Sequence, residues 1–117
     1  MLNKNTGKLG EDMACEYLSS KGIRILRRNF KSVYGEIDII AQDDTDIIFV
    51  EVKTRKNNRC GIPAESVDKK KQTKIKNTSL EFINQNDLAR ANFRFDVIEI
   101  ILSSKPTINH IENAFEF

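Results

Sequence analysis

Apolar residues near the start of the chain recur at the three- and four-residue spacing of one helix face. They are Leu9, Met13, Ala14, Tyr17 and Leu18. Gly22 follows them, and glycine tolerates the left-handed backbone at which many helices end. The pattern predicts a helix over residues 6–21.

The next apolar segments are short and rich in branched residues, which is typical of strands. They are residues 23–29, 36–42 and 47–53. A basic turn around Arg27, Arg28 and Lys31 is expected after the first segment. Because only the polar cluster at residues 43–46 separates the other two, they predict a β-hairpin.

The second half of the chain predicts another helix. Pro63 and the polar residues around Ser66 and Asp68 open it, and the polar stretch at residues 84–87 ends it. The residues expected on its buried stripe are Ile75, Ser79, Phe82 and Ile83. Those expected on its exposed face are Lys69, Lys70, Lys71, Lys74 and Lys76.

The last apolar segments complete an α/β fold. Residues 93–102 have the apolar density of a strand, and residues 107–117 predict an edge strand after the break at Pro106. The element order is then helix, three strands, helix, and one or two strands. This order predicts a mixed central sheet flanked by helices, in a single domain over residues 1–117.

The register of the predicted hairpin brings charged residues together. If the two strands pair symmetrically around the loop at residues 43–46, Asp38 lies opposite Glu51. Lys53 is two residues beyond Glu51, so it points to the same face, and it lies opposite Glu36.

Both faces of the hairpin are apolar toward its turn. One face is expected to hold Ile37, Ile39, Ile48, Val50 and Val52, and the other Ile40, Ile47 and Phe49. Such a strand normally lies inside a covered sheet, so the charges at its far end are expected to be partly desolvated.

When two carboxylates lie close together and are partly desolvated, the pKa of one of them rises because the two charges repel each other. A divalent cation bound between them relieves this repulsion. An all-oxygen site made by Asp38 and Glu51 suits Mg²⁺ or Mn²⁺. The alternative interpretation is a plain cross-strand ion-pair cluster at the rim of the sheet, formed with Glu36 and Lys53.

The composition is typical of one globular domain and restricts the kinds of binding partner that we expect. The 117 residues are 39% hydrophobic and 31% charged, and the longest aliphatic or aromatic run, residues 47–50, is far too short to cross a bilayer. The first ten residues lack the apolar stretch of a secretory signal, so we expect a cytoplasmic protein with no membrane contact. With 19 basic and 17 acidic residues the net charge is only +2, so the distribution of charge must attract any polyanion.

The stretch GEIDIIAQDDTDIIFVEVKTRK, residues 35–56, resembles the YraN-like family of small uncharacterised bacterial proteins. That family is assigned to the PD-(D/E)XK nuclease superfamily and is related to archaeal-type Holliday junction resolvases. The resemblance continues through residues 7–30, 61–75 and 94–100, so it covers nearly the whole chain except the C-terminal tail. It implies a restriction endonuclease-like core. One departure is Ile37, which stands where the motif has a proline that is not a ligand.

The resemblance also implies roles for individual residues. Asp38 matches the motif aspartate, Glu51 the (D/E) position and Lys53 the lysine. Glu11 resembles the acidic residue that resolvase-like members bring to the metal from the first helix, although a solvated surface glutamate is the alternative. Asp38, Glu51 and Glu11 would then hold Mg²⁺ or Mn²⁺. Lys53 would orient a water molecule or stabilise negative charge in the transition state.

The leading hypothesis is therefore a metal-dependent endonuclease that hydrolyses phosphodiesters of structured or branched DNA. A basic track for nucleic acid, or else a solvated charged face, is formed by Arg27, Arg28, Arg55, Lys69, Lys70, Lys71 and Lys74. One competing hypothesis is a catalytically inactive nucleic-acid-binding accessory module of the same fold, and another is a structural domain. Sequence leaves open whether the substrate is a junction, flap, single strand or RNA, and whether the protein forms a homodimer on a symmetric substrate.

Three other polar residues have open roles. Asp96 lies in an apolar strand, where it either supports the site from behind or forms an ion pair with Arg94. His110, the only histidine, is expected at the surface or at a sheet edge. Spacing alone does not establish whether Gln72 approaches the site.

Overall fold

A computed structural model of the chain describes residues 4–56 and 67–116. The elements are α1 (Lys4–Ser20), β1 (Arg24–Ser32), β2 (Gly35–Asp43), β3 (Asp46–Arg55), α2 (Lys69–Gln85), β4 (Asn92–Ile101) and β5 (Thr107–Phe115). The strands form one sheet in the order β1-β2-β3-β4-β5, in which only β3 and β4 are parallel. The mixed α/β fold predicted from the element order is confirmed, including the final edge strand.

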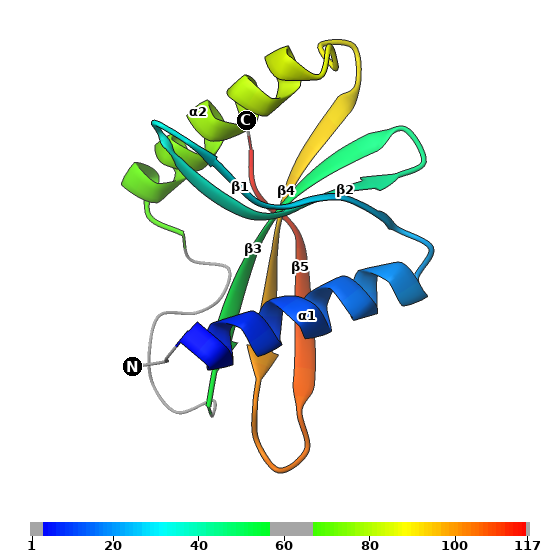
Figure 1. Ribbon diagram of the computed structural model, residues 1–117, viewed down its shortest axis with the longest axis vertical. Coiled ribbons are helices and arrows are strands. Elements are labelled where there is room, and N and C mark those ends of the chain that lie inside the picture. Colours follow the sequence, from blue (N-terminus) through cyan, green and yellow to red (C-terminus); the bar gives the residue numbers. More distant parts are fainter. Residues whose placement is uncertain (1–3, 57–66, 117) are drawn as a thin grey trace.

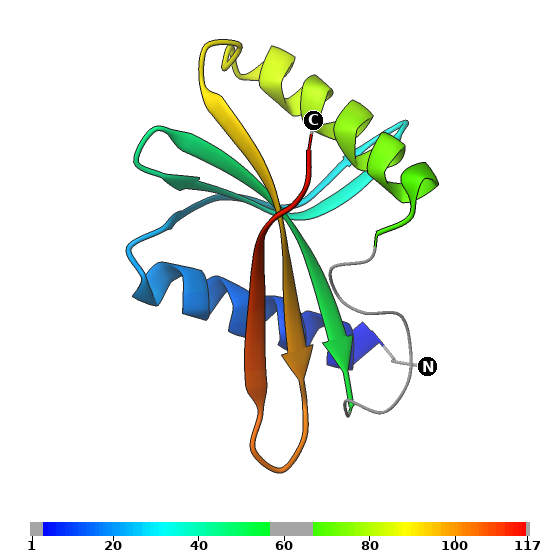
Figure 2. The same ribbon diagram turned by 180° about the vertical axis from the view of Figure 1, so that it is seen from behind.

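The two helices cover opposite faces of a strongly twisted sheet (Figure 1). Ala14 and Leu18 of α1 pack on one face against apolar side chains of β2, β3 and β4. Phe82 and Ile83 of α2 pack on the other face, where Phe49 of β3 lies edge-on to Phe82. Figure 2 shows the same arrangement from behind, with β5 at the edge of the sheet beside β4. No helix within the described residues has the length and apolar character needed to cross a bilayer.

Asp68, one of the residues predicted to open the second helix, begins α2. Asp68 is its N-cap, and the carboxylate accepts a hydrogen bond of 2.8 Å from the backbone N–H of Lys71. Pro63 and Ser66, the other predicted helix openers, lie outside the described residues. The predicted buried stripe of this helix is confirmed. The predicted stripe of α1 is wrong at Leu9, whose exposed fraction is 49%.

The β1 strand continues through the region predicted to be a basic turn. Arg27, Arg28 and Lys31 all pair with β2, and the connection to β2 follows Ser32. Asn29 lies inside this strand with a positive φ of 53°, which bends the strand without ending its pairing. Polar residues are tolerated here because β1 is an edge strand with one side open to solvent.

The bend also changes which face the hairpin buries. Ile37 was predicted to share a face with Ile39, but it packs with Phe30 and Ile75 on the α2 side, whereas Ile39 packs on the α1 side. The prediction is wrong because strict alternation fails at Asp38. β2 is paired with β1 at Ile39 and again at Ile37, the two neighbours of Asp38. The strand therefore stays paired while it turns toward α2 at Asp38.

A close approach of α1 to β3 depends on Gly10. A methyl group at this buried position would overlap the Thr54 side chain of β3. The helix can therefore lie directly against the strand that carries Glu51 and Lys53 only because this residue is glycine.

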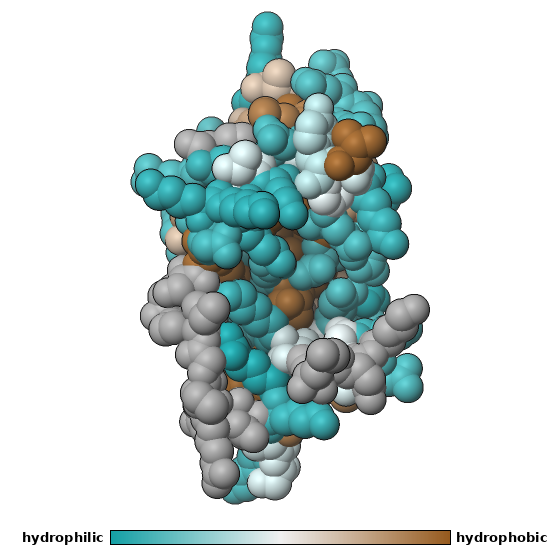
Figure 3. All heavy atoms as spheres, turned by 90° about the vertical axis from the view of Figure 1, so that its left-hand side faces the viewer, coloured by the Kyte–Doolittle hydropathy of each residue, from teal (hydrophilic) through white to brown (hydrophobic). Residues whose placement is uncertain are grey.

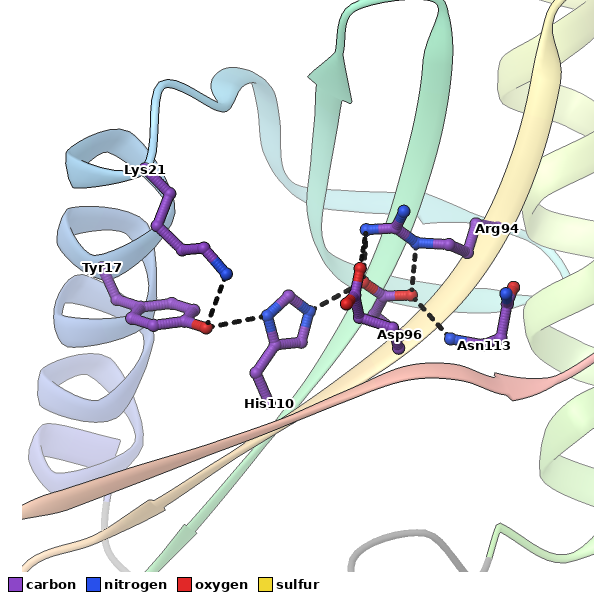
Figure 4. Close-up of polar contacts among 7 residues, drawn as sticks. Tyr17, Lys21, Arg94, Asp96, His110 and Asn113 are labelled. Carbon is purple, nitrogen blue, oxygen red and sulfur yellow. Dashed lines mark hydrogen bonds and ion pairs between the residues drawn. The ribbon is translucent and has the colours of Figure 1, made fainter.

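A buried polar network joins α1 to the strands β4 and β5 (Figure 4). The carboxylate of Asp96, which is 1% exposed, accepts hydrogen bonds from Arg94 at 2.9 and 3.0 Å, from His110 Nε2 at 2.7 Å and from the Asn113 backbone at 3.1 Å. Burial alone would raise the pKa of Asp96, but these hydrogen bonds outweigh burial and lower it below its ordinary value. The ion pair with Arg94, one of the two interpretations of Asp96, is thus present.

The network then reaches the helix through the only histidine. His110 Nδ1 lies 3.0 Å from the hydroxyl of Tyr17, which also accepts a hydrogen bond of 3.2 Å from Lys21. Both ring nitrogens of His110 therefore lie within hydrogen-bond distance of a partner. His110 belongs to the edge strand β5 as predicted, but its side chain is only 6% exposed and is not a surface group.

Replacing Gly10 by alanine should destabilise the protein by about 1–3 kcal/mol, because the new methyl group overlaps Thr54 and forces α1 away from β3. Urea unfolding measures the change. Gly7→Ala is the matched control in the same helix, where an added methyl meets nothing within 4 Å; it should stabilise the protein by about 0.5–1 kcal/mol. Equal effects of the two substitutions would contradict the close approach.

Replacing His110 by alanine should lower the free energy of unfolding by about 2–4 kcal/mol, because Asp96 loses a hydrogen bond while it stays buried. Tyr17→Phe removes only the hydroxyl that contacts His110 and should cost about 1 kcal/mol. Both values come from urea unfolding at one pH. If His110→Ala lowers the free energy of unfolding by less than Tyr17→Phe does, the network contributes little to stability.

Candidate functional site

Asp38 lies where the β2–β3 ladder ends. The predicted register is confirmed from the turn as far as the pair Ile39 and Val50. The predicted direct pairing of Asp38 with Glu51 is not part of the ladder, since β2 bends away at this point. Asp38 Oδ2 instead accepts a hydrogen bond of 2.8 Å from the Val52 backbone N–H, so the side chain replaces a backbone carbonyl.

The predicted pairing of Lys53 with Glu36 is also absent. Glu36 pairs with Lys31 of β1, and the carboxylate lies 3.9 Å from the Lys31 ammonium. The cross-strand cluster expected from the register is therefore divided, because β2 follows β1 rather than β3 beyond the bend.

The electrostatics of Asp38 show that acidic side chains converge on it. Burial of the carboxyl raises the pKa of Asp38 to about 7, although the hydrogen bond from Val52 acts in the opposite direction. The neighbouring carboxylates of Glu51, Glu11 and Glu36 raise it further, in that order. The three elements α1, β2 and β3 thus supply negative charge to one small region.

Glu51 has one satisfied oxygen and one unsatisfied oxygen. Its side chain is 13% exposed, and Oε1 lies 3.1 Å from the ammonium of Lys71. Oε2 is buried and has no hydrogen-bond partner among the described residues. A buried carboxylate oxygen without a partner is costly, so this atom marks a place where a cation or donor is favoured.

Asp38 and Glu51 also line the same small cavity of about 10 Å³. This is about the space that one water molecule needs. The other lining residues include Glu36, Ile37, Phe49, Ile75 and Asp96. Asp96 therefore borders the site, as one of its two predicted roles required, although its carboxylate is held by Arg94 and His110.

Lys53 is half-buried on β3, close to Glu51. Burial lowers the pKa of Lys53 below its ordinary value, and the positive charges of Arg55 and Lys71 act in the same direction. The charge of Glu51 acts in the opposite direction. The expected grouping of two acidic residues with a lysine is thus present around the end of the ladder.

Glu11 approaches the group from α1 but has a basic partner there. Its Oε1 lies 3.6 Å from Arg28, which makes a shorter contact of 2.8 Å with Asp12. Within residues 4–56 and 67–116, no group of three or more His, Cys, Asp or Glu side chains is arranged to hold a metal ion. Asp38 and Glu51 line one cavity, whereas the Glu11 carboxylate contacts Arg28.

The predicted basic track is only partly continuous. Lys71 reaches the site through Glu51, and Arg55 forms an ion pair of 2.8 Å with Glu99. Arg27 lies over the Phe30 ring at 5.3 Å, while Arg28 is held by α1. The lysines exposed along the first turns of α2 are Lys69, Lys70, Lys71 and Lys74. Figure 3 views the side that faces left in Figure 1, and its surface is mainly hydrophilic.

Two contacts of the site were missed by sequence reasoning. The Val52 N–H that holds Asp38 is a backbone group, and no side-chain pattern marks it. The contact of Lys71 with Glu51 joins residues of α2 and β3, whose relative placement the sequence does not reveal. Gln72, left open before, donates to the Val67 carbonyl at 2.7 Å and so helps to shape the entry to α2.

The fold and site define a small mixed α/β protein in which carboxylates and lysines gather where a β-ladder breaks. Over residues 10–100 the sequence matches the family described as "Uncharacterised protein family UPF0102", and the chain belongs to that family. This confirms the resemblance to YraN-like proteins.

Relatives from several bacteria match almost the whole chain. A UPF0102 protein of Clostridioides difficile is 50% identical over 115 residues, which cover 98% of this chain and 100% of that protein. One from Dictyoglomus turgidum is 47% identical, with coverage of 98% and 100%. One from Alkaliphilus oremlandii is 46% identical, with coverage of 97% and 100%.

The raised pKa of Asp38 predicts a pH-dependent stability. Because the folded pKa of about 7 exceeds the ordinary 3.8, the folded state keeps a proton that the unfolded chain has lost. This carboxyl therefore stabilises the fold fully below about pH 4, and the contribution is lost as the pH rises through about 7.

Asp38→Asn keeps an oxygen that can accept from Val52 but cannot ionise, so its stability relative to the wild type should increase with pH. Between about pH 4 and pH 8 the increase should be roughly 2–4 kcal/mol, measured by urea unfolding without divalent cations. Asp44→Asn, at an exposed position of the hairpin turn, should show no such trend. A pH-independent difference for Asp38→Asn would contradict the raised pKa.

Proposed function

We propose that this protein is a Mg²⁺- or Mn²⁺-dependent endonuclease of the PD-(D/E)XK type, with a restriction endonuclease-like core, that cleaves structured or branched DNA. The observation that supports this most directly is the shared cavity of Asp38 and Glu51, with Lys53 beside Glu51. Two carboxylates and a lysine in this order and proximity are the groups that the resemblance assigns to phosphodiester hydrolysis.

The donor set fits a hard divalent cation. Glu51 Oε2 is buried and unsatisfied, and Asp38 has a raised pKa because burial and neighbouring carboxylates disfavour its charge. A cation between the two would relieve both costs, and oxygen ligands suit Mg²⁺ and Mn²⁺. Glu11 would join them after separation from Arg28. When bound, such a cation acidifies a water molecule and neutralises charge on the phosphate.

The protein itself orients these groups. The Val52 N–H holds one oxygen of Asp38, so the other oxygen has a fixed direction. Lys53 lies on β3, two residues beyond Glu51, and its ammonium would stabilise negative charge on the phosphate as the transition state forms. The exposed lysines of α2 add sequence-independent attraction to the nucleic-acid backbone.

A second candidate is an inactive nucleic-acid-binding module of the same fold. It is favoured by one observation, that Lys71 and Arg28 already neutralise Glu51 and Glu11. In such a protein the carboxylates would orient basic side chains toward nucleic acid and would not take part in catalysis.

Labelled junction, flap, single-stranded and duplex DNA, with RNA counterparts, should separate the two candidates. An endonuclease should cleave at least one of them with Mg²⁺ or Mn²⁺ and none with a chelator. Asp38→Asn, Glu51→Gln and Lys53→Met should each lose at least about 100-fold in rate, because each removes a group that acts on the reacting phosphate. Asp87→Asn, at an exposed position beyond α2, should cleave normally.

Circular dichroism and urea unfolding would show that each variant is folded. Salt-dependent binding without cleavage, by the wild type and all variants, would support the inactive module. Cleavage that survives Asp38→Asn would rule out the proposed site.

A further inference from the structure

The ammonium group of Lys71 lies where the candidate site favours a cation. It lies 3.1 Å from Glu51 Oε1, and the carboxylate is almost buried, with 13% exposed. The lysine side chain is 52% exposed, so it approaches the carboxylate from the solvent side. The same carboxylate is the proposed metal ligand, and its other oxygen has no hydrogen-bond partner within residues 4–56 and 67–116.

A divalent cation and an ammonium group compete for one carboxylate. Both are positive, so a metal held by Asp38 and Glu51 would repel Lys71 at this distance. Lys53 would add to the repulsion, because its positive charge already interacts unfavourably with Lys71.

Resting on the proposed function, we propose that Lys71 is an internal counter-ion that the metal displaces from Glu51, and that the displaced side chain then binds a phosphate of the nucleic acid. Metal binding and nucleic-acid binding would then strengthen each other. Such coupling is reciprocal, because each ligand changes the affinity for the other by the same factor.

The local structure allows the side chain to move while the backbone stays fixed. The Lys71 N–H is held by the N-cap Asp68 at 2.8 Å, and Lys71 lies in the first turn of α2. Only the long, flexible side chain must change direction. Its release requires the loss of one ion pair, in which the lysine side chain is half-exposed and the carboxylate is almost buried.

The surroundings favour a phosphate as the new partner. The first turn of a helix presents backbone N–H groups and a positive dipole, and here it also carries Lys69 and Lys70, which are exposed. Lys71 turned outward would join these two lysines at the edge of the site. Before displacement it contributes less, because Glu51 neutralises it.

Metal affinity tests the first half of the inference. Mn²⁺ binding is measured by calorimetry and by electron paramagnetic resonance on the wild type, Lys71→Met, Lys71→Arg and Lys70→Met. Lys71→Met should bind Mn²⁺ roughly two- to fivefold more tightly, since the competing ion pair is gone. Lys71→Arg keeps a competing cation and should stay near the wild type. Lys70→Met removes the neighbouring charge and corrects for general electrostatics.

The affinity for a labelled branched DNA, with a chelator and with Ca²⁺, tests the second half. Ca²⁺ should tighten DNA binding by the wild type, and this gain should be smaller for Lys71→Met. Lys70→Met should weaken DNA binding by a similar factor in both conditions, because its exposed charge does not depend on metal.

The outcomes separate this inference from the proposed function. If the wild type binds Mn²⁺ but Lys71→Met binds it no more tightly than Lys70→Met does, the displacement is wrong and the proposed metal site stands. The displacement is also wrong if Ca²⁺ strengthens DNA binding equally in both lysine variants. If no variant binds Mn²⁺, the proposed metal-dependent function and this inference both fail.

Discussion

The site depends on one interaction, the hydrogen bond from the Val52 backbone to the carboxylate of Asp38. The β2–β3 ladder ends one residue earlier, and a backbone donor left there would be unsatisfied without a substitute. Asp38 supplies the acceptor, so β2 can bend toward α2 without leaving that donor of β3 unpaired. The same contact places a negative charge where the strands separate, close to Glu51.

The arrangement has an energetic cost that gives the site its character. Acidic groups that are partly removed from water repel one another, and the protein offsets this in three different ways. Asp38 has a raised pKa, Glu51 has a lysine partner, and Glu11 has an arginine partner. The buried carboxylate of Asp96 is stabilised differently, because several hydrogen-bond donors surround it and keep it ionised. Reactivity is expected of the first group and rigidity of the second.

The sequence predicted regular elements and short-range geometry well. The hairpin register from the turn to Ile39 was deduced from the polar loop alone, since strands of a tight hairpin have few alternative pairings. Where the sequence failed, the cause was long-range or conformational. Neither the positive φ of Asn29 nor the break in alternation at Asp38, beyond which Ile37 packs on the α2 side, is visible in a pattern of apolar residues. The contact between Tyr17 and His110 joins positions 93 residues apart, and no local signal marks it.

The candidate site was predicted to a similar degree. Asp38, Glu51 and Lys53 were identified by hairpin spacing and by the family resemblance, because all three lie on one local unit. The basic partners of the acidic side chains come from outside it: Lys71 of α2 contacts Glu51, and Arg28 of β1 contacts Glu11. Spacing within a hairpin cannot reveal which distant cation lies above which carboxylate, so this level of detail required the three-dimensional structure.

The parallel pairing of β3 with β4 has a consequence for biosynthesis. β3 is complete at Arg55, but its second neighbour begins only at Asn92, after α2 has been made. A nascent chain that has not yet reached β4 therefore carries the apolar run of residues 47–50 on an open strand edge, a form prone to aggregation. We expect the ribosome-bound intermediate, rather than the finished protein, to be the species that most needs chaperones.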